Sequence, residues 1–171
     1  MELMVVTSII AILVAIAIPQ YSAVALQMRT NAAANELLND IQFARVMSQR
    51  TGVPHYINAN YGGGSGVNYK VQRAAAPPAI APSSDPAVRT VNLGPKLAGV
   101  VFTQNGASTD CFGGAAGTAI PAAQLVFSSR GLPGTASSYF VGSSDGKNEY
   151  VVTVSGAGRA RICHRVGAGW Q

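Results

Sequence analysis

The most informative hydrophobic pattern is an uncharged run at the start of the chain. It extends from Leu3 to Ile18, is interrupted only by a Thr-Ser pair, follows Glu2 and ends before Pro19. Such a run predicts a helix of about 24 Å, somewhat short of the roughly 30 Å hydrocarbon core of a bilayer. A carboxylate at the start of this helix costs on the order of a few kcal/mol to insert, so Glu2 indicates a partner or a task.

A helical pattern resumes beyond Pro19, where apolar and small residues recur at steps of three and four until about Arg50. Gly52 suits the left-handed position that follows a helix, and Pro54 blocks its continuation. The two stretches together predict one rod of about 73 Å that begins at Glu2, longer than a membrane anchor needs. Because Pro19 removes a backbone hydrogen bond, we expect a kink or a locally melted turn there.

After Pro54 the pattern changes to short alternating or β-branched runs, which predict strands. The runs are His55–Asn58, Val67–Gln72, Val88–Leu93, Gly99–Thr103, Gln124–Ser128, Ser138–Val141, Glu149–Val154 and Arg159–Arg165. Stretches rich in Gly, Pro or Ser predict the intervening loops, at Gly62–Gly66, Ala74–Pro86, Asn105–Thr118 and Ser143–Lys147. The last two runs are joined by Ser155-Gly156-Ala157-Gly158, which predicts a terminal hairpin.

Length and charge narrow the classes of protein that fit these patterns. A chain of 171 residues allows one helical stalk and one domain of roughly 120 residues. The net charge is +5. From position 130 onward the sequence has two acidic residues, Asp145 and Glu149, and five basic ones, namely Arg130, Lys147, Arg159, Arg161 and Arg165. A basic surface favours anionic partners such as nucleic acid, phospholipid headgroups or acidic proteins. The alternative is that these charges only keep the domain soluble.

Few residues are suited to covalent or catalytic chemistry. Cys111 and Cys163 are the two cysteines, which in an exported domain predicts one disulfide worth about 4 kcal/mol. Their spacing with His55 and His164 matches no metal-ligand pattern, so we expect no metal and no cofactor. No hydrolase, metalloprotease or phosphate-loop motif is present in the sequence, so we expect no catalytic residues and no enzyme activity. The segment Asp145–Asn148 predicts a β-turn rather than a calcium loop.

The segment ELMVVTSIIAILVAIAIPQY at residues 2–21 resembles the N-terminal helix of type IV pilins and pseudopilins, where a glutamate precedes an apolar helix interrupted by a proline. The resemblance implies that Glu2 guides assembly by meeting the N-terminal amine of a neighbouring subunit, as a desolvated carboxylate seeks a cation. It also implies that a leader and the first mature residues lie before Met1. A secretory signal would carry a basic region first, and a plain anchor explains neither Glu2 nor Pro19.

Three further segments resemble the H-type pseudopilins and the FimT/FimU minor pilins. They are NELLNDIQFARVMSQRTG at residues 35–52, LVFSSRG at Leu125–Gly131 and GRARIC at Gly158–Cys163. The resemblance implies a pilin fold. It also implies that the Gly-Arg-x-Arg segment captures DNA during natural transformation, with Arg159 and Arg161 at the matching positions.

The alternation of a strand places Arg159, Arg161, Cys163 and Arg165 on one face. Guanidinium groups about 7 Å apart along this strand match the repeat of a phosphate backbone, and arginine binds phosphate through two parallel hydrogen bonds. Such binding is independent of DNA sequence and depends steeply on salt. The alternative is a solvated edge strand whose arginines discourage aggregation or contact another protein.

These patterns together predict an α+β pilin fold, in which a long N-terminal helix, kinked near Pro19, packs on a small antiparallel β-sheet domain. We expect residues 1–28 to form the membrane and filament-core half of the helix. Residues 29–171 form the globular head, with the amphipathic helix half ending at about residue 51.

The expected function is that of a minor pilin that primes or assembles a type IV pilus for twitching and binds DNA through Arg159, Arg161 and Arg165. The alternative is the H-type tip pseudopilin of a type II secretion system. The expected partners are other pilins, the bacterial inner membrane and double-stranded DNA. The expected location is the inner membrane, with the head in the periplasm, and then the filament.

Overall fold

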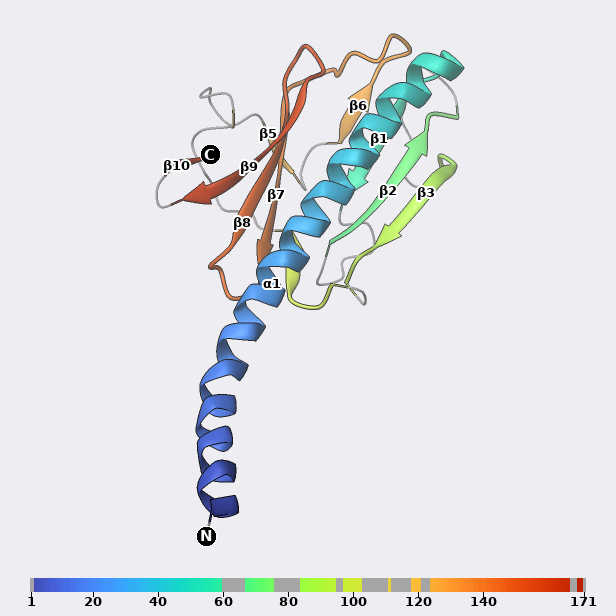
Figure 1. Cartoon of the computed structure of the whole chain (residues 1–171). Coiled ribbons are helices and arrows are strands. Elements are labelled where there is room, and N and C mark those ends of the chain that lie inside the picture. The colour runs from blue at the N-terminus through green and yellow to red at the C-terminus, as the bar shows by residue number, and fades with distance from the viewer. Residues whose placement is uncertain are drawn as a thin grey trace.

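The computed structural model describes residues 2–59, 67–75, 84–94, 97–102, 111, 118–120, 124–166 and 169–170. In this part of the chain one helix, α1 (Glu2–Thr51), is followed by short strands. The strands are β1 (His55–Ala59), β2 (Asn68–Arg73), β3 (Ala87–Asn92), β4 (Val100–Phe102), β5 (Thr118–Ile120), β6 (Leu125–Phe127), β7 (Ser137–Ser143), β8 (Glu149–Val154), β9 (Ala160–Val166) and β10 (Gly169–Trp170). The C-terminal half of α1 lies across the strands, and its N-terminal half projects beyond them (Figure 1).

The helix α1 ends where the sequence predicts. Gly52 adopts a left-handed conformation with φ 67°, and its N–H donates to the carbonyl of Ser48 at 3.0 Å, which closes the last turn. The backbone is helical through Pro19, so the expectation of a melted turn at this position is wrong. Proline lacks one N–H but fits helical φ, and the flanking turns hold the backbone in the helix. The kink near Pro19 stays a prediction, as does the division of the chain at residue 28.

The strands form two sheets beside α1. The first is antiparallel with the order β3-β2-β1-β6, and the second has the order β10-β9-β8-β7-β4. Strand β5 also pairs with β7, in parallel, along Ser137–Tyr139, whereas β4 pairs antiparallel along Val141–Ser143. The predicted α+β architecture is therefore confirmed, with one parallel pair in an otherwise antiparallel arrangement.

Each of the eight predicted runs overlaps an observed strand, and the predicted terminal hairpin is β8 and β9. Strand β5 begins at the end of the predicted loop Asn105–Thr118, and β10 follows the last predicted run. These two strands have only three and two residues, too few to show an alternating pattern. They are defined by pairing with β7 and β9 rather than by their own sequence.

The core lies between one face of α1 and both sheets. Small and aliphatic residues at helical spacing are fully buried on this face, namely Ala33, Ala34, Leu37, Ile41 and Ala44. They pack against β-strand residues that include Ile57, Tyr69, Phe127, Tyr139 and Val152. Because alanine side chains are short, the strands approach the helix closely, and burial of this face fixes α1 on the head.

One charged residue, Asp40, lies within this buried face and is only 1% exposed. Its Oδ2 accepts a hydrogen bond from the hydroxyl of Tyr69 on β2 at 2.7 Å, and its Oδ1 lies 2.8 Å from Nη1 of Arg89 on β3. Burial raises the pKa of Asp40, although the Tyr69 hydrogen bond and the Arg89 charge oppose this effect. These contacts tie the edge strand β3 to α1.

Candidate assembly surface and basic groove

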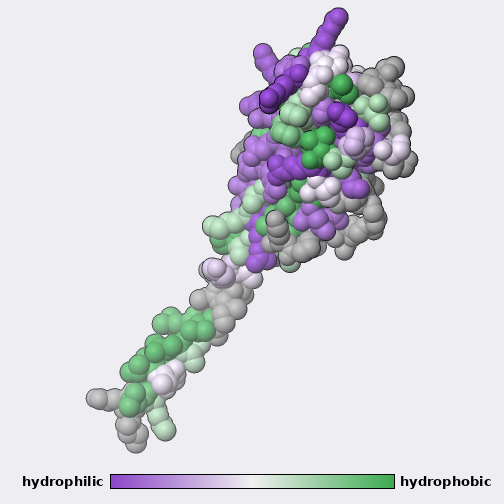
Figure 2. All heavy atoms as spheres, turned by 90° about the vertical axis from the view of Figure 1, so that its right-hand side faces the viewer, coloured by the Kyte–Doolittle hydropathy of each residue, from purple (hydrophilic) through white to green (hydrophobic). Residues whose placement is uncertain are grey.

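The projecting half of α1 carries an exposed apolar surface. Large hydrophobic side chains are between 48% and 80% exposed here, namely Leu3, Met4, Val5, Val6, Ile9, Ile10, Ile12, Leu13 and Val14. Figure 2 shows hydrophobic side chains over this part of the rod and a largely hydrophilic head. An apolar surface of this extent is typical of a protein–protein or membrane contact.

The polar residues of this surface are satisfied within the helix. Thr7 Oγ1 donates to the carbonyl of Met4 at 3.0 Å, and Ser8 Oγ donates to that of Val5 at 2.7 Å. Both hydroxyls can therefore enter an apolar environment without losing a hydrogen bond. In the described part of the chain, no helix is both long enough and apolar enough to cross a membrane.

The hairpin of β8 and β9 is held against α1 at its turn. Gly158 ends the turn with φ 77°, and its carbonyl accepts a hydrogen bond from Arg45 Nη1 of α1 at 2.8 Å. A Cβ on Gly158 would lie 3.2 Å from Cζ of Arg45 and 3.4 Å from Cδ of Pro133. The left-handed backbone favours glycine here, and a Cβ would also crowd the guanidinium of Arg45.

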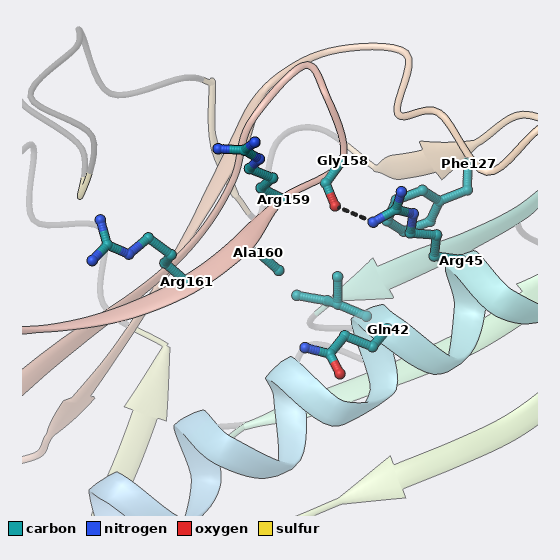
Figure 3. A pocket seen from close by; sticks show the side chains of 8 residues that line it. Gln42, Arg45, Phe127, Gly158, Arg159, Ala160 and Arg161 are labelled. Atoms are coloured by element: carbon teal, nitrogen blue, oxygen red, sulfur yellow. Dashed lines mark hydrogen bonds between the residues drawn. The ribbon is translucent and has the colours of Figure 1, made fainter.

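A groove of about 490 Å³ lies between α1 and the start of β9. We call it the basic groove, and it is lined by Ile41, Gln42, Arg45, Phe127, Gly158, Arg159, Ala160 and Arg161. Figure 3 shows Arg159 and Arg161 extending from β9 away from α1, whereas Arg45 reaches from α1 toward Gly158. Arg159 and Arg161 are exposed, and Arg45 is half-buried.

The third predicted arginine, Arg165, has a different environment. Its Nη1 lies 2.7 Å from Oε2 of Glu149, whose side chain is only 6% exposed. Arg165 does not line the basic groove. The structure therefore brings Arg159 and Arg161 together at the groove but places Arg165 in an ion pair with a buried carboxylate.

Comparison with known proteins identifies the family of this chain. The family model described as Type II transport protein GspH matches residues 33–158. The chain belongs to the GspH family. A solved structure, the type IV minor pilin FimU of Pseudomonas aeruginosa, is similar to this chain with a TM-score of 0.51 and 18% identity, covering 82% of this chain and 91% of FimU. A search of curated proteins finds no significant match.

The chain is thus a member of the GspH family with the fold of a type IV pilin. The predicted resemblance to the H-type pseudopilins is therefore confirmed, and two of the segments that carried it, residues 35–52 and Leu125–Gly131, lie within the matched range.

The disulfide predicted for this GspH-family chain is present, between Cys111 and Cys163 with their Cα atoms 5.8 Å apart. Cys163 packs in a small buried cluster with Phe140 and Val151 on the face of the second sheet. The bond attaches Cys111 to β9. It fixes the strand that carries the arginines.

The two histidines occupy separate places in the head. His55 is buried, with Nδ1 2.8 Å from the carbonyl of Val53, and His164 stacks on Tyr150 with ring centroids 4.6 Å apart. Among the described residues, no cluster of three or more His, Cys, Asp or Glu side chains could hold a metal ion. Asp145 accepts hydrogen bonds from the Ser143 hydroxyl and the Lys147 N–H, which lower its pKa and form the predicted turn.

Two contacts of the predicted or groove-lining arginines were not predicted from the sequence. Arg45 lies on the helix, 113 positions before its partner Gly158, so no local pattern connects them. The pairing of Arg165 with Glu149 spans the β8–β9 hairpin, whose register is set by the pairing of Tyr150 with His164. A register argument across the predicted hairpin would have found the second feature but not the first.

Proposed function

We propose that this protein is a minor pilin of a type IV pilus that assembles through α1 and binds DNA at the basic groove. The observation that carries the proposal is the pair of exposed arginines, Arg159 and Arg161, beside the groove at the start of β9. The DNA is double-stranded and is bound without regard to sequence, because arginines on an exposed strand meet phosphates rather than base edges.

Assembly rests on the projecting half of α1. The head does not cover its apolar side chains, so burying them against lipid or against other helices is favourable. We assign this half to the bacterial inner membrane before assembly, with the head in the periplasm, and to the filament core afterwards. Glu2 then pairs with a neighbouring subunit, and Pro19 allows the helix to bend within the filament.

DNA binding rests on charge and spacing. The chain carries a net charge of +5, and residues two positions apart on a strand lie about 7 Å apart. Each phosphate that an arginine neutralises releases a counterion, and the slope of log K against log salt changes by about 0.9 per contact. Two contacts therefore predict a weak affinity at physiological salt that rises steeply when the salt is lowered.

The test is binding of the full chain, in a nonionic detergent, to a fluorescein-labelled duplex followed by anisotropy between about 50 and 200 mM salt. We expect the double variant R159Q/R161Q to reduce the salt slope by about 1.8, the sum of two contacts. The control R50Q/R73Q removes the same charge from exposed positions elsewhere and should retain the slope. The proposal fails if the wild type does not bind at about 50 mM salt, or if both double variants behave alike.

A second candidate function is the H-type tip pseudopilin of a type II secretion system, and the description of the matching family favours it. The two functions differ in what the cell loses without the protein. Deletion of the gene in the organism of origin should abolish pili and transformation in the first case. In the second case it should abolish secretion of folded proteins and leave pili intact.

A further inference from the structure

We infer that Arg45 of α1 is a further DNA-binding residue, and that phosphate is bound at the junction of α1 and β9 by Arg45, Arg159 and Arg161. Arg165 is then outside the site. This inference rests on the proposed function, since it names the residues that carry DNA binding. It moves the site from the length of β9 to one end of it.

Arg45 is held in place with most of its hydrogen-bonding capacity unused. A guanidinium has five N–H donors, and within the part of the chain that the structure describes Arg45 uses one of them, on Nη1, for the carbonyl of Gly158 at 2.8 Å. Among the described residues, Arg45 contacts no carboxylate: the observed ion pairs join Arg89 to Glu36 and Asp40, and Arg165 to Glu149. Because the carbonyl fixes the guanidinium, little side-chain entropy is lost when a phosphate binds.

The groove favours an anion that spans the helix and the strand. All three arginines line the groove: Arg45 reaches into it from α1, and Arg159 and Arg161 belong to its β9 side (Figure 3). The wall between them includes the apolar side chains of Ile41, Phe127 and Ala160. Apolar walls lower the local dielectric constant, which strengthens attraction between guanidinium and phosphate.

Arg165 is unsuited to the same task. Its partner Glu149 is 5% exposed, so moving Arg165 to a phosphate would leave a buried carboxylate without its cation. Breaking such a pair is strongly unfavourable. The ion pair therefore keeps Arg165 on β9 and away from DNA.

The inference also explains the glycine of the Gly-Arg-x-Arg segment. Any side chain at position 158 would press on the guanidinium of Arg45 and would be strained by the left-handed φ. The Gly158 carbonyl accepts the hydrogen bond that holds Arg45 at the groove. The motif acts together with a residue of α1 that is remote in sequence.

The experiment compares single variants of the full chain in the same anisotropy assay with the labelled duplex. We expect R45Q to weaken binding about tenfold at about 50 mM salt, the effect of one charge-assisted hydrogen bond, and to reduce the salt slope by about 0.9. R45K keeps the charge and should keep the slope while losing affinity. The matched controls R50Q, on the same helix, and R165Q should change the affinity less than about twofold.

The outcomes separate this inference from the proposed function. If R159Q/R161Q loses binding but R45Q binds like R50Q, the inference is wrong and the proposed function stands. The inference is also wrong if R165Q weakens binding as much as R45Q does. The same holds if R45K reduces the salt slope as much as R45Q does, because Arg45 would then have a purely structural role. If the wild type does not bind DNA, both fall. Thermal melting of each variant confirms that the head remains folded.

Discussion

At the scale of single residues, Asp40 is a charge placed where only apolar residues are expected. It is nearly fully buried on α1, it accepts a hydrogen bond from Tyr69, and it lies against Arg89. The same burial and the same hydrogen bond raise the pKa of the Tyr69 hydroxyl. The periodicity of α1 places Asp40 beside Leu37 and Ile41, but its partners come from strands that no helical pattern identifies.

Substitution of Asp40 should change how stability depends on pH. Burial raises its pKa above the ordinary value of 3.8, so the folded state binds this proton more tightly than the unfolded state. The contribution of Asp40 to the free energy of unfolding is therefore greatest below pH 3.8 and falls as the pH rises through the raised pKa. D40N keeps an acceptor for Tyr69 and should lack this decline, as measured by urea unfolding between about pH 3 and 7.

Asp145 provides the control with the opposite sign. Its pKa is lowered by hydrogen bonds from Ser143 and Lys147, so its contribution is present above the unfolded pKa and is lost as the pH falls. Asp145 therefore makes the wild type slightly more stable as the pH rises, and D145N should lack this increase. D40N should instead lack the decrease in stability that Asp40 causes as the pH rises. Parallel pH profiles for wild type and D40N would show that Asp40 does not titrate in this range.

At the scale of elements, β9 is fixed from three directions. It pairs with β8 along its length, its turn is bound to α1 through Gly158, and Cys163 is bonded to Cys111. The strand is therefore a rigid support for the arginines at its start. Rigid support is what a site needs when its ligands are held by side chains rather than by a deep pocket.

The disulfide should contribute measurably to the free energy of unfolding of the head. C111S/C163S removes a crosslink between positions 52 apart, which the chain-entropy model values at about 4 kcal/mol of unfolding free energy. We expect urea unfolding of the oxidised wild type to show this difference, with a reductant lowering the wild type to the level of the variant. Coincident curves for the oxidised proteins would contradict a stabilising role, and the reductant should leave C111S/C163S unchanged.

The elements also show how far the sequence determines this fold. The length of α1, its end at Gly52 and eight strands follow from hydrophobic period, turn residues and helix signals, all of which act over a few residues. The short strands β5 and β10 depend on partners far away, as does the contact of Arg45 with Gly158. The arginines were found because a strand alternates, but their separation into groove and ion pair depends on tertiary packing.

At the scale of the whole molecule, the two candidate sites lie at opposite ends of one rod. The apolar half of α1 projects from the head, and the basic groove lies beside the other half (Figure 1). Packing the apolar half against neighbouring helices would leave the groove at the surface of the filament. The arrangement separates assembly from DNA binding, so a variant of one site should spare the other.

Glu2 offers the test of this separation. In cells that make the filament, E2Q should reduce the amount of subunit in sheared filaments by about tenfold or more, because an ion pair in a low-dielectric setting is lost. S8A on the same helix removes a hydroxyl that donates to the Val5 carbonyl within α1, so it should assemble normally. Immunoblots of filament and membrane fractions give the readout, and detergent-solubilised E2Q should still bind DNA like the wild type. Normal incorporation of E2Q would show that the apolar surface of α1 suffices for assembly and that Glu2 has no part in it.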